Sequence, residues 1–202
     1  MSTVTPFAVL AMIGAVSGSV TAWLLLRRDR PAEVLTPSAP PEPVPDEVEA
    51  QLLADDYSTR LAALDSFAEY ADGHPDRRQQ CVDEILEEFE YEWPDQPAWQ
   101  AELWRRLLPH LRTGSPRFWP GMDLDFDDLV LYAVDLRGCE VRKASFAGTY
   151  FAGPVDFTGA TAAAFDFTGA QVRTDADVVR TWPPGWAPGE PEPPPWVELR
   201  ET

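Results

Sequence analysis

The chain has 202 residues, of which 34 are acidic and 16 are Lys or Arg, and its formal net charge at pH 7 is −18. This charge argues against unaided binding of nucleic acid, because affinity for the phosphate backbone comes largely from Lys and Arg. The cysteines, Cys81 and Cys139, form no CxxC motif, so the sequence supports neither a disulfide framework nor a structural zinc site. We interpret both as small buried hydrophobic residues.

An apolar run from Phe7 to Leu26 contains no charged residue and is followed at once by Arg27, Arg28 and Arg30. About twenty helical residues at about 1.5 Å each cover about 30 Å, the thickness of a hydrocarbon core. The run predicts a transmembrane helix, and the arginines predict a single-pass protein of the cell membrane with a cytoplasmic body. A secretory signal peptide is the alternative, but the basic cluster follows the apolar run instead of preceding it.

Inside this predicted helix, Gly14 and Gly18 form a GxxxG spacing. Small residues at this spacing let two membrane helices approach closely, so a homodimer through this face is one interpretation. Small residues are also common in membrane helices in general, and this alternative stays open. Residues 1–29 are the predicted anchor with its basic flank, and the proline-rich residues 30–50 are an extended linker.

Residues 51–117 have apolar side chains at helical spacing in three segments. The first carries Leu61, Leu64, Ala68 and Ala71, the second Val82, Ile85, Leu86 and Phe89, and the third Leu103, Trp104, Leu107, Leu108 and Leu111. Gly73 and Pro75 separate the first two segments, and Pro109 is expected to kink or shorten the third. The dense acidic residues of the second segment predict a solvated face, because the DxDxDG pattern of a calcium loop is absent.

Residues 118–178 carry a bulky apolar residue at intervals of five. The series is Phe126, Leu131, Leu136, Val141, Phe146 and Phe151, then after a six-residue step Phe157, with Ala162, Phe167 and Val172 continuing the count. Neither the period of a helix nor that of a strand produces this spacing. A short fixed period predicts a solenoid, in which each unit buries its apolar residue against stacked neighbours.

The segments AVDLRGCEV, ASFAG, VDFTGA and FDFTGA resemble the pentapeptide-repeat family, whose repeat is A(D/N)LXX. The helical run before them resembles the actinobacterial variety of that family. The resemblance implies an α+β protein in which the helical segment caps a short right-handed quadrilateral β-helix. It places eight side chains in the solenoid core: Leu131, Leu136, Val141, Phe146, Phe151, Phe157, Phe167 and Val172. Ala162 and Phe165 depart from the repeat, and the six-residue step predicts a bulge.

The proline-rich residues 179–202 include Trp182, Trp186 and Trp196. Disorder is one interpretation of this composition, and a partner-binding tail is the other. The tryptophans favour docking, either onto the body of the protein or onto a partner.

The sequence contains no Ser/His/Asp order, nucleophile elbow, Walker loop or dinucleotide fingerprint. We assign structural roles near helix ends to His74 and His110. Paired carboxylates such as Asp127 and Asp128 lack a context that forms a pocket for acid–base catalysis. We therefore predict that the protein is not an enzyme and holds neither a cofactor nor a metal.

These features predict a non-catalytic, membrane-anchored pentapeptide-repeat protein that acts as an interaction scaffold on the cytoplasmic side. Its predicted partners are the membrane, through the N-terminal helix, and an unknown protein. The alternative is an acidic DNA mimic that binds a DNA-handling enzyme, because some pentapeptide-repeat proteins imitate duplex DNA and occupy DNA gyrase. Length argues against it, since a stack of roughly 10–14 Å matches only about four base pairs.

Overall fold

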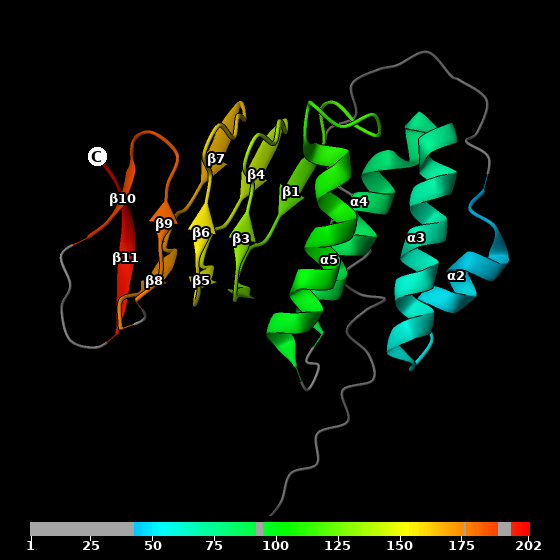
Figure 1. Ribbon diagram of the computed structural model, residues 1–202, viewed down its shortest axis with the longest axis horizontal. Coiled ribbons are helices and arrows are strands. Elements are labelled where there is room, and N and C mark those ends of the chain that lie inside the picture. Colours follow the sequence, from blue (N-terminus) through cyan, green and yellow to red (C-terminus); the bar gives the residue numbers. More distant parts are fainter. Residues whose placement is uncertain (1–42, 92–94, 176, 190–194) are drawn as a thin grey trace, which may run out of the picture. The chain divides into compact units, whose positions relative to one another are not determined.

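The computed structural model describes residues 43–91, 95–175, 177–189 and 195–202. They form an α+β structure in which helices come first and strands follow (Figure 1). The helices are α2 (Asp46–Leu52), α3 (Tyr57–Gly73), α4 (Arg78–Glu87) and α5 (Gln96–Leu111), with 3-10 turns at Pro75–Arg77 and Glu88–Glu90. The strands are β1 (Asp123–Asp125), β2 (Val130–Leu131), β3 (Val134–Asp135), β4 (Lys143–Ser145), β5 (Tyr150–Phe151), β6 (Val155–Asp156), β7 (Ala164–Asp166), β8 (Gln171–Arg173), β9 (Arg180–Thr181), β10 (Trp186–Pro188) and β11 (Trp196–Glu201).

Two of the helices begin at aspartates that cap them. The Asp56 carboxylate accepts a hydrogen bond from the Thr59 N–H at 2.8 Å, and the Asp95 carboxylate accepts one from the Ala98 N–H at 3.2 Å. Such side chains satisfy N–H groups that the first turn of a helix leaves unpaired. Pro109 lies in the last turn of α5 and the helix continues to Leu111, so this proline does not end it.

The strands belong to three sheets, and every third strand of β1 to β9 returns to the same sheet. The sheet orders are β1-β4-β7, β3-β6-β9 and β2-β5-β8, the last extended by β11 and β10. Pairing within β1 to β9 is parallel, so that Leu124 lies beside Ala144 and Ala144 beside Phe165. The pairs β8–β11 and β10–β11 are antiparallel.

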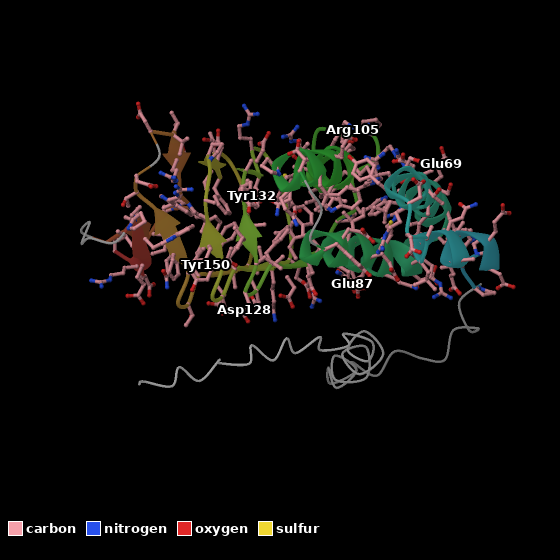
Figure 2. The ribbon with its side chains drawn as sticks, turned by 90° about the horizontal axis from the view of Figure 1, so that it is seen from below. Glu69, Glu87, Arg105, Asp128, Tyr132 and Tyr150 are labelled. Atoms are coloured by element: carbon pink, nitrogen blue, oxygen red, sulfur yellow. The ribbon has the colours of Figure 1, made fainter. Side chains whose placement is uncertain are left out.

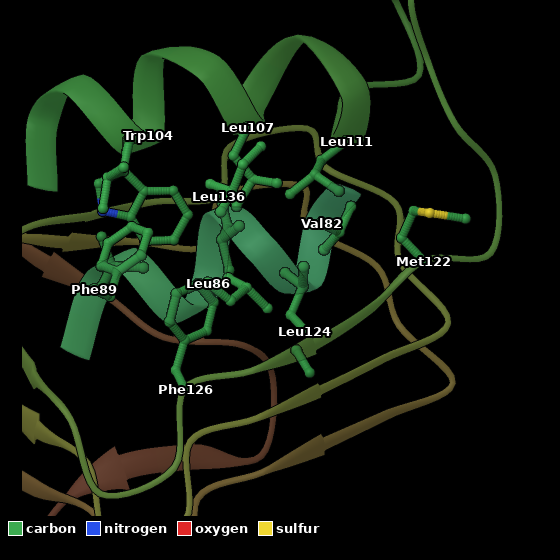
Figure 3. Close-up of a cluster of buried hydrophobic side chains, with 14 of the residues drawn as sticks. Val82, Leu86, Phe89, Trp104, Leu107, Leu111, Met122, Leu124, Phe126 and Leu136 are labelled. Carbon is green, nitrogen blue, oxygen red and sulfur yellow. The ribbon is translucent and has the colours of Figure 1, made fainter. Parts of the chain in front are cut away.

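Stacked aromatic rings form the centre of the core. The rings of Phe126 and Phe146 lie 5.2 Å apart, those of Phe146 and Phe167 lie 5.1 Å apart, and both pairs are nearly parallel. Phe126 also contacts Phe89 and Trp104, so the helices and the strands share one core (Figure 3). The eight residues assigned to the solenoid core are all buried: Leu131, Leu136, Val141, Phe146, Phe151, Phe157, Phe167 and Val172.

The prediction of a right-handed quadrilateral β-helix solenoid is wrong. The strands of the described residues form three separate sheets, none of which is closed, and one sheet mixes parallel with antiparallel strands. Where a fourth side would run, the described residues form only isolated bridges, between Arg112 and Cys139 and between Glu140 and Thr161. The departures at Ala162 and Phe165 do not break the strand register, because Ala144 still pairs with Phe165 and Ser145 with Asp166.

The predicted membrane anchor also needs correction. Its span, Phe7 to Leu26, and the dimer face at Gly14 and Gly18 lie outside the described residues. In the part of the chain that the structure describes, no helix is both long enough and apolar enough to cross a bilayer. The membrane as a partner, the single-pass topology and the cell-membrane location therefore have no support in the structure.

Candidate functional site

Each of the three sheets has an edge strand that lies nearest the helices, and we call this its first edge: β1, β2 or β3. Helix side chains cover the first edges formed by β1 and β2. Gln79 of α4 donates to the Asp123 carbonyl of β1 at 3.0 Å and accepts from the Asp123 N–H at 2.8 Å. Gln100 of α5 donates to the Val130 carbonyl at 2.8 Å and accepts from the Tyr132 N–H at 2.9 Å. Each amide pairs one donor and one acceptor with the strand, as a neighbouring strand would. The edges of β1 and β2 are therefore blocked to another chain.

The first edge of the third sheet is also covered by α5. The Trp104 indole donates to the Ala133 carbonyl, just before β3, at 2.8 Å. Beyond β3, Arg112 Nε donates to the Arg137 carbonyl at 3.1 Å, and the Leu111 carbonyl accepts from the Glu140 N–H at 2.8 Å. All three sheets thus end, on this side, against helical residues.

On the opposite side, β9 and β10 carry features that discourage strand pairing. Pro188 in β10 has no N–H, and Pro183 follows closely after the short strand β9. The Arg180 side chain of β9 turns back and donates to the Gly153 carbonyl at 3.1 Å. Proline, charge and shortness are the usual means by which proteins protect exposed strand edges.

The edge of β7 has less protection. Among the described residues β7 pairs only with β4, and it contains no proline. The residues before it, Thr161 to Ala163, are uncharged, Ala164 is exposed, and Phe165 is only half-buried. The Asp166 carbonyl accepts from the Phe146 N–H at 2.7 Å, so Asp166 faces β4. Because alternate residues of a parallel strand pair with opposite neighbours, Phe165 directs its N–H and carbonyl toward the free side.

One acidic side chain, Asp166, lies at the end of this free edge, and Asp125 and Asp127 lie across the sheet at and just after β1. Asp125, Ser145 and Asp166 are successive partners across the sheet. Asp127 accepts from the Ser145 hydroxyl at 2.5 Å and the Ala147 N–H at 2.9 Å. The Asp166 carboxylate accepts a hydrogen bond from the Thr168 N–H at 2.9 Å. This bond, followed by the contribution of the Thr168 hydroxyl, holds the pKa of Asp166 below its usual value. The free edge therefore carries a fixed negative charge at neutral pH.

The tryptophans assigned to a partner-binding tail lie against the body of the protein. The Trp182 ring contacts Phe151 at 5.0 Å and also lies beside Phe157 and Phe167. The Trp186 ring lies 4.9 Å from that of Phe167, and Trp196 contacts Tyr150 edge-on at 5.3 Å. All three are half-buried, so they form part of the fold around β8.

His110 and the cysteines Cys81 and Cys139 are buried in this structure. His110 stacks on Trp119 at 3.6 Å, and burial lowers its pKa to about 4, which keeps the ring neutral. Burial raises the pKa of the Cys139 thiol to about 11 and raises that of Cys81 further, so neither forms a thiolate readily. The described ranges hold no group of three or more His, Cys, Asp or Glu side chains that could bind a metal ion.

Sequence reasoning did not identify Gln79 or Gln100 as important residues. Gln100 lies on the same helical face as Leu103 and Leu107, where a polar residue is unexpected, and that was the available signal. Comparisons with known proteins found no matching family model, no matching curated protein and no matching solved structure. The resemblance to the pentapeptide-repeat family therefore stays a prediction from the motifs.

Proposed function

We propose that the protein is a non-catalytic interaction module that binds an extended segment of a partner protein along the free edge of β7. The observation that supports this proposal is the contrast between the edges. Gln79 and Gln100 block two of them, prolines limit pairing at β9 and β10, and the proline-free edge of β7 keeps backbone groups directed outward. Addition of a strand to such an edge is a common mode of peptide recognition.

The side chains around β7 define the partner's chemistry. Ala163 and Ala164 are small and exposed, so an approaching backbone meets little steric obstruction. Asp166, held in its charged form, favours Lys or Arg at the neighbouring position of the added strand. We therefore propose a segment with small or β-branched residues followed by a basic one. A second copy of the chain fits less well, because two molecules of charge −18 would repel each other.

The test is selection of binders from a random peptide library with the full chain, followed by amide hydrogen exchange. We expect selected peptides to be extended and rich in basic residues. In their complexes the Phe165 N–H should exchange more slowly, whereas exchange at the exposed residue Val179 should not change. Protection elsewhere with no change at Phe165 would overturn the proposal.

A pair of proline variants provides the matched control. Phe165→Pro removes the outward N–H of β7 and should abolish peptide binding. Val179→Pro alters an exposed position whose carbonyl still accepts from the Val155 N–H, and it should bind as the unmodified chain does. Equal binding by both variants would contradict the assignment of the site to β7. The exchange measurement on the unmodified chain still tests the proposal if Phe165→Pro fails to fold.

A further inference from the structure

A cleft rich in arginine lies beside the C-terminal half of α5. It has a volume of about 710 Å³, and its lining includes Arg105, Leu108, Pro109, Arg112, Gly114 and Arg137. Three of the lining residues are arginines and none is acidic, in a chain whose net charge is −18. Small-molecule sites commonly enclose roughly 300–1,000 Å³, so the cleft is large enough for a ligand.

A single carboxylate holds two of these arginines in place. Asp135 accepts from Arg112 Nη2 at 3.0 Å, and from Arg137 Nε at 2.9 Å and Nη2 at 2.8 Å. These bonds, those of Arg137 first, lower the pKa of Asp135 to about 2. Asp135 therefore holds both guanidinium groups, and Asp156 Oδ2 lies 3.7 Å from Arg137 Nε. Arg112 also lies beside the Cys139 thiol, whereas Arg137 Nη1 makes no hydrogen bond with another described residue and can donate to a ligand.

The third arginine comes from another part of the cleft wall. Arg105 projects outward from α5 (Figure 2), its side chain is 63% exposed, and it pairs with Glu102 at 2.8 Å. Arg105 lies on the helix and Arg137 follows β3, so their guanidinium groups come from separate elements of the fold. Leu108 and Pro109 supply a half-buried apolar surface between them.

The negative end of α5 does not account for this positive charge. Free carbonyl groups at a helix C-terminus attract basic side chains. In α5, however, the Leu108 carbonyl accepts from the Arg112 N–H, the His110 carbonyl from the Trp119 N–H and the Leu111 carbonyl from the Glu140 N–H. Backbone donors therefore already occupy these carbonyls, so the helix end does not explain why three arginines line the cleft.

We propose that this cleft binds a phosphate group carried by a small molecule or by a phosphorylated side chain. A carboxylate has two oxygens, and one guanidinium can satisfy both, as Arg137 does with Asp135. A phosphate ester has three acceptor oxygens and close to two negative charges, which suit a cleft lined by three arginines, two from α5 and its C-cap and one from the residues after β3. The site is separate from β7 and does not depend on the proposed strand addition.

Titration of the full chain, followed by backbone amide NMR, tests this proposal. The probes are inorganic phosphate, phosphoserine, a phosphoserine peptide and the same peptide with glutamate in place of phosphoserine. We expect saturable shifts of the Gly114 and Gly138 signals, because both glycines line the cleft, with phosphate-bearing probes. Binding of the peptide alone indicates a phosphorylated protein as the source, and binding of free phosphoserine indicates a small molecule.

Arginine variants make the test specific. Arg137→Gln and Arg105→Gln should each weaken phosphate binding about tenfold, the effect expected for loss of a charged hydrogen bond. Arg105 contacts Glu102 on the exposed helix surface, so its removal leaves the Asp135 pairs intact. Arg173→Gln is the matched control, because Arg173 also pairs with an aspartate two residues away, Asp175 at 2.5 Å, but lies outside the cleft. Equal losses in all three variants, or equal binding of the glutamate peptide, would overturn the proposal.

Discussion

The side-chain oxygen of Gln100 accepts a 2.9 Å hydrogen bond from the backbone N–H of Tyr132, and the same amide donates to the Val130 carbonyl. Gln100 is 1% exposed, so its amide is shielded from solvent. Gln100→Ala leaves both backbone groups unpaired and should lower the free energy of unfolding by about 2–4 kcal/mol. Urea denaturation measures this loss. Gln51→Ala, which removes only an exposed contact with Glu47, should change it by less than about 0.5 kcal/mol, and equal effects would argue against edge closure.

Gly153 lies against the backbone of the neighbouring turn of chain. A Cβ atom at this position would come within 1.7 Å of the Tyr132 carbonyl oxygen. Gly153→Ala should therefore destabilise the protein by about 1–3 kcal/mol, since a backbone atom has to move. Gly73→Ala is the control, because a Cβ there meets nothing within 4 Å and alanine favours the helix. Thermal unfolding should separate the two variants, and equal melting temperatures would mean that the chain near Tyr132 adapts freely.

The acidic face of α4 predicts a pH effect. Burial, together with Glu87 and Asp83, raises the pKa of Glu84 to about 7 from its ordinary value of 4.5. The folded state therefore holds this proton more tightly than the unfolded state, and the contribution of Glu84 to stability falls as pH rises from about 4.5 to 7. Glu84→Gln should be more stable than the unmodified chain at pH 8 and nearly equal to it at pH 4. The same difference at both pH values would contradict the raised pKa.

His110 opposes this effect over much of the same range. Its pKa falls to about 4 from 6.5, mainly through burial and then through the charge of Arg117. The unfolded state therefore takes up the proton first, and the contribution of His110 to stability is lost as pH falls from about 6.5 to 4. The stability of the unmodified chain should change little between pH 5 and pH 6. In Glu84→Gln it should rise with pH there, which guanidinium denaturation at several pH values can measure.

Trp182 provides a test of the role of the C-terminal residues. Its ring packs on Phe151 at 5.0 Å and is half-buried, so Trp182→Ala should lower the free energy of unfolding by about 2–3 kcal/mol. Trp196→Ala should cost less, because Trp196 contacts Tyr150, which is itself 37% exposed. Calorimetry gives both values. Unchanged stability in Trp182→Ala would contradict a structural role and favour the prediction that Trp182 contacts a partner.

The sequence alone identified many buried side chains but not how the sheets end. Apolar spacing works for Phe146 and Phe167, because a residue that recurs with each strand meets its equivalent in the core. The same spacing does not show whether the sheets close, because closure depends on pairing near Glu140 and Thr161 that only isolated bridges achieve. The repeat and the family resemblance predict a quadrilateral β-helix, whereas the described strands form three open sheets.

The candidate sites were harder to predict from the sequence than the core. Gln100 bonds to residues about thirty positions away, and a single glutamine gives no hint of which backbone it meets. The arginine cleft joins Arg105, Arg112 and Arg137, which share no motif and come together only through the tertiary structure. The composition of the proline-rich tail does not decide between docking and disorder. In the structure Val197 pairs with Val172 in an antiparallel register, and composition does not encode such a register.

One helix sets the spacing between two of the sheets. Gln100 and Trp104 lie one turn apart on α5, and each bonds to the first edge of a different sheet. The pitch of an α-helix, about 5.4 Å, thus sets the distance between the two anchoring side chains and so the positions of the strands near Val130 and Ala133. A one-residue insertion between Gln100 and Trp104 would rotate one anchor away from its carbonyl, whereas an insertion in an exposed loop would not. Length changes within α5 are therefore constrained by geometry that acts far from the helix itself.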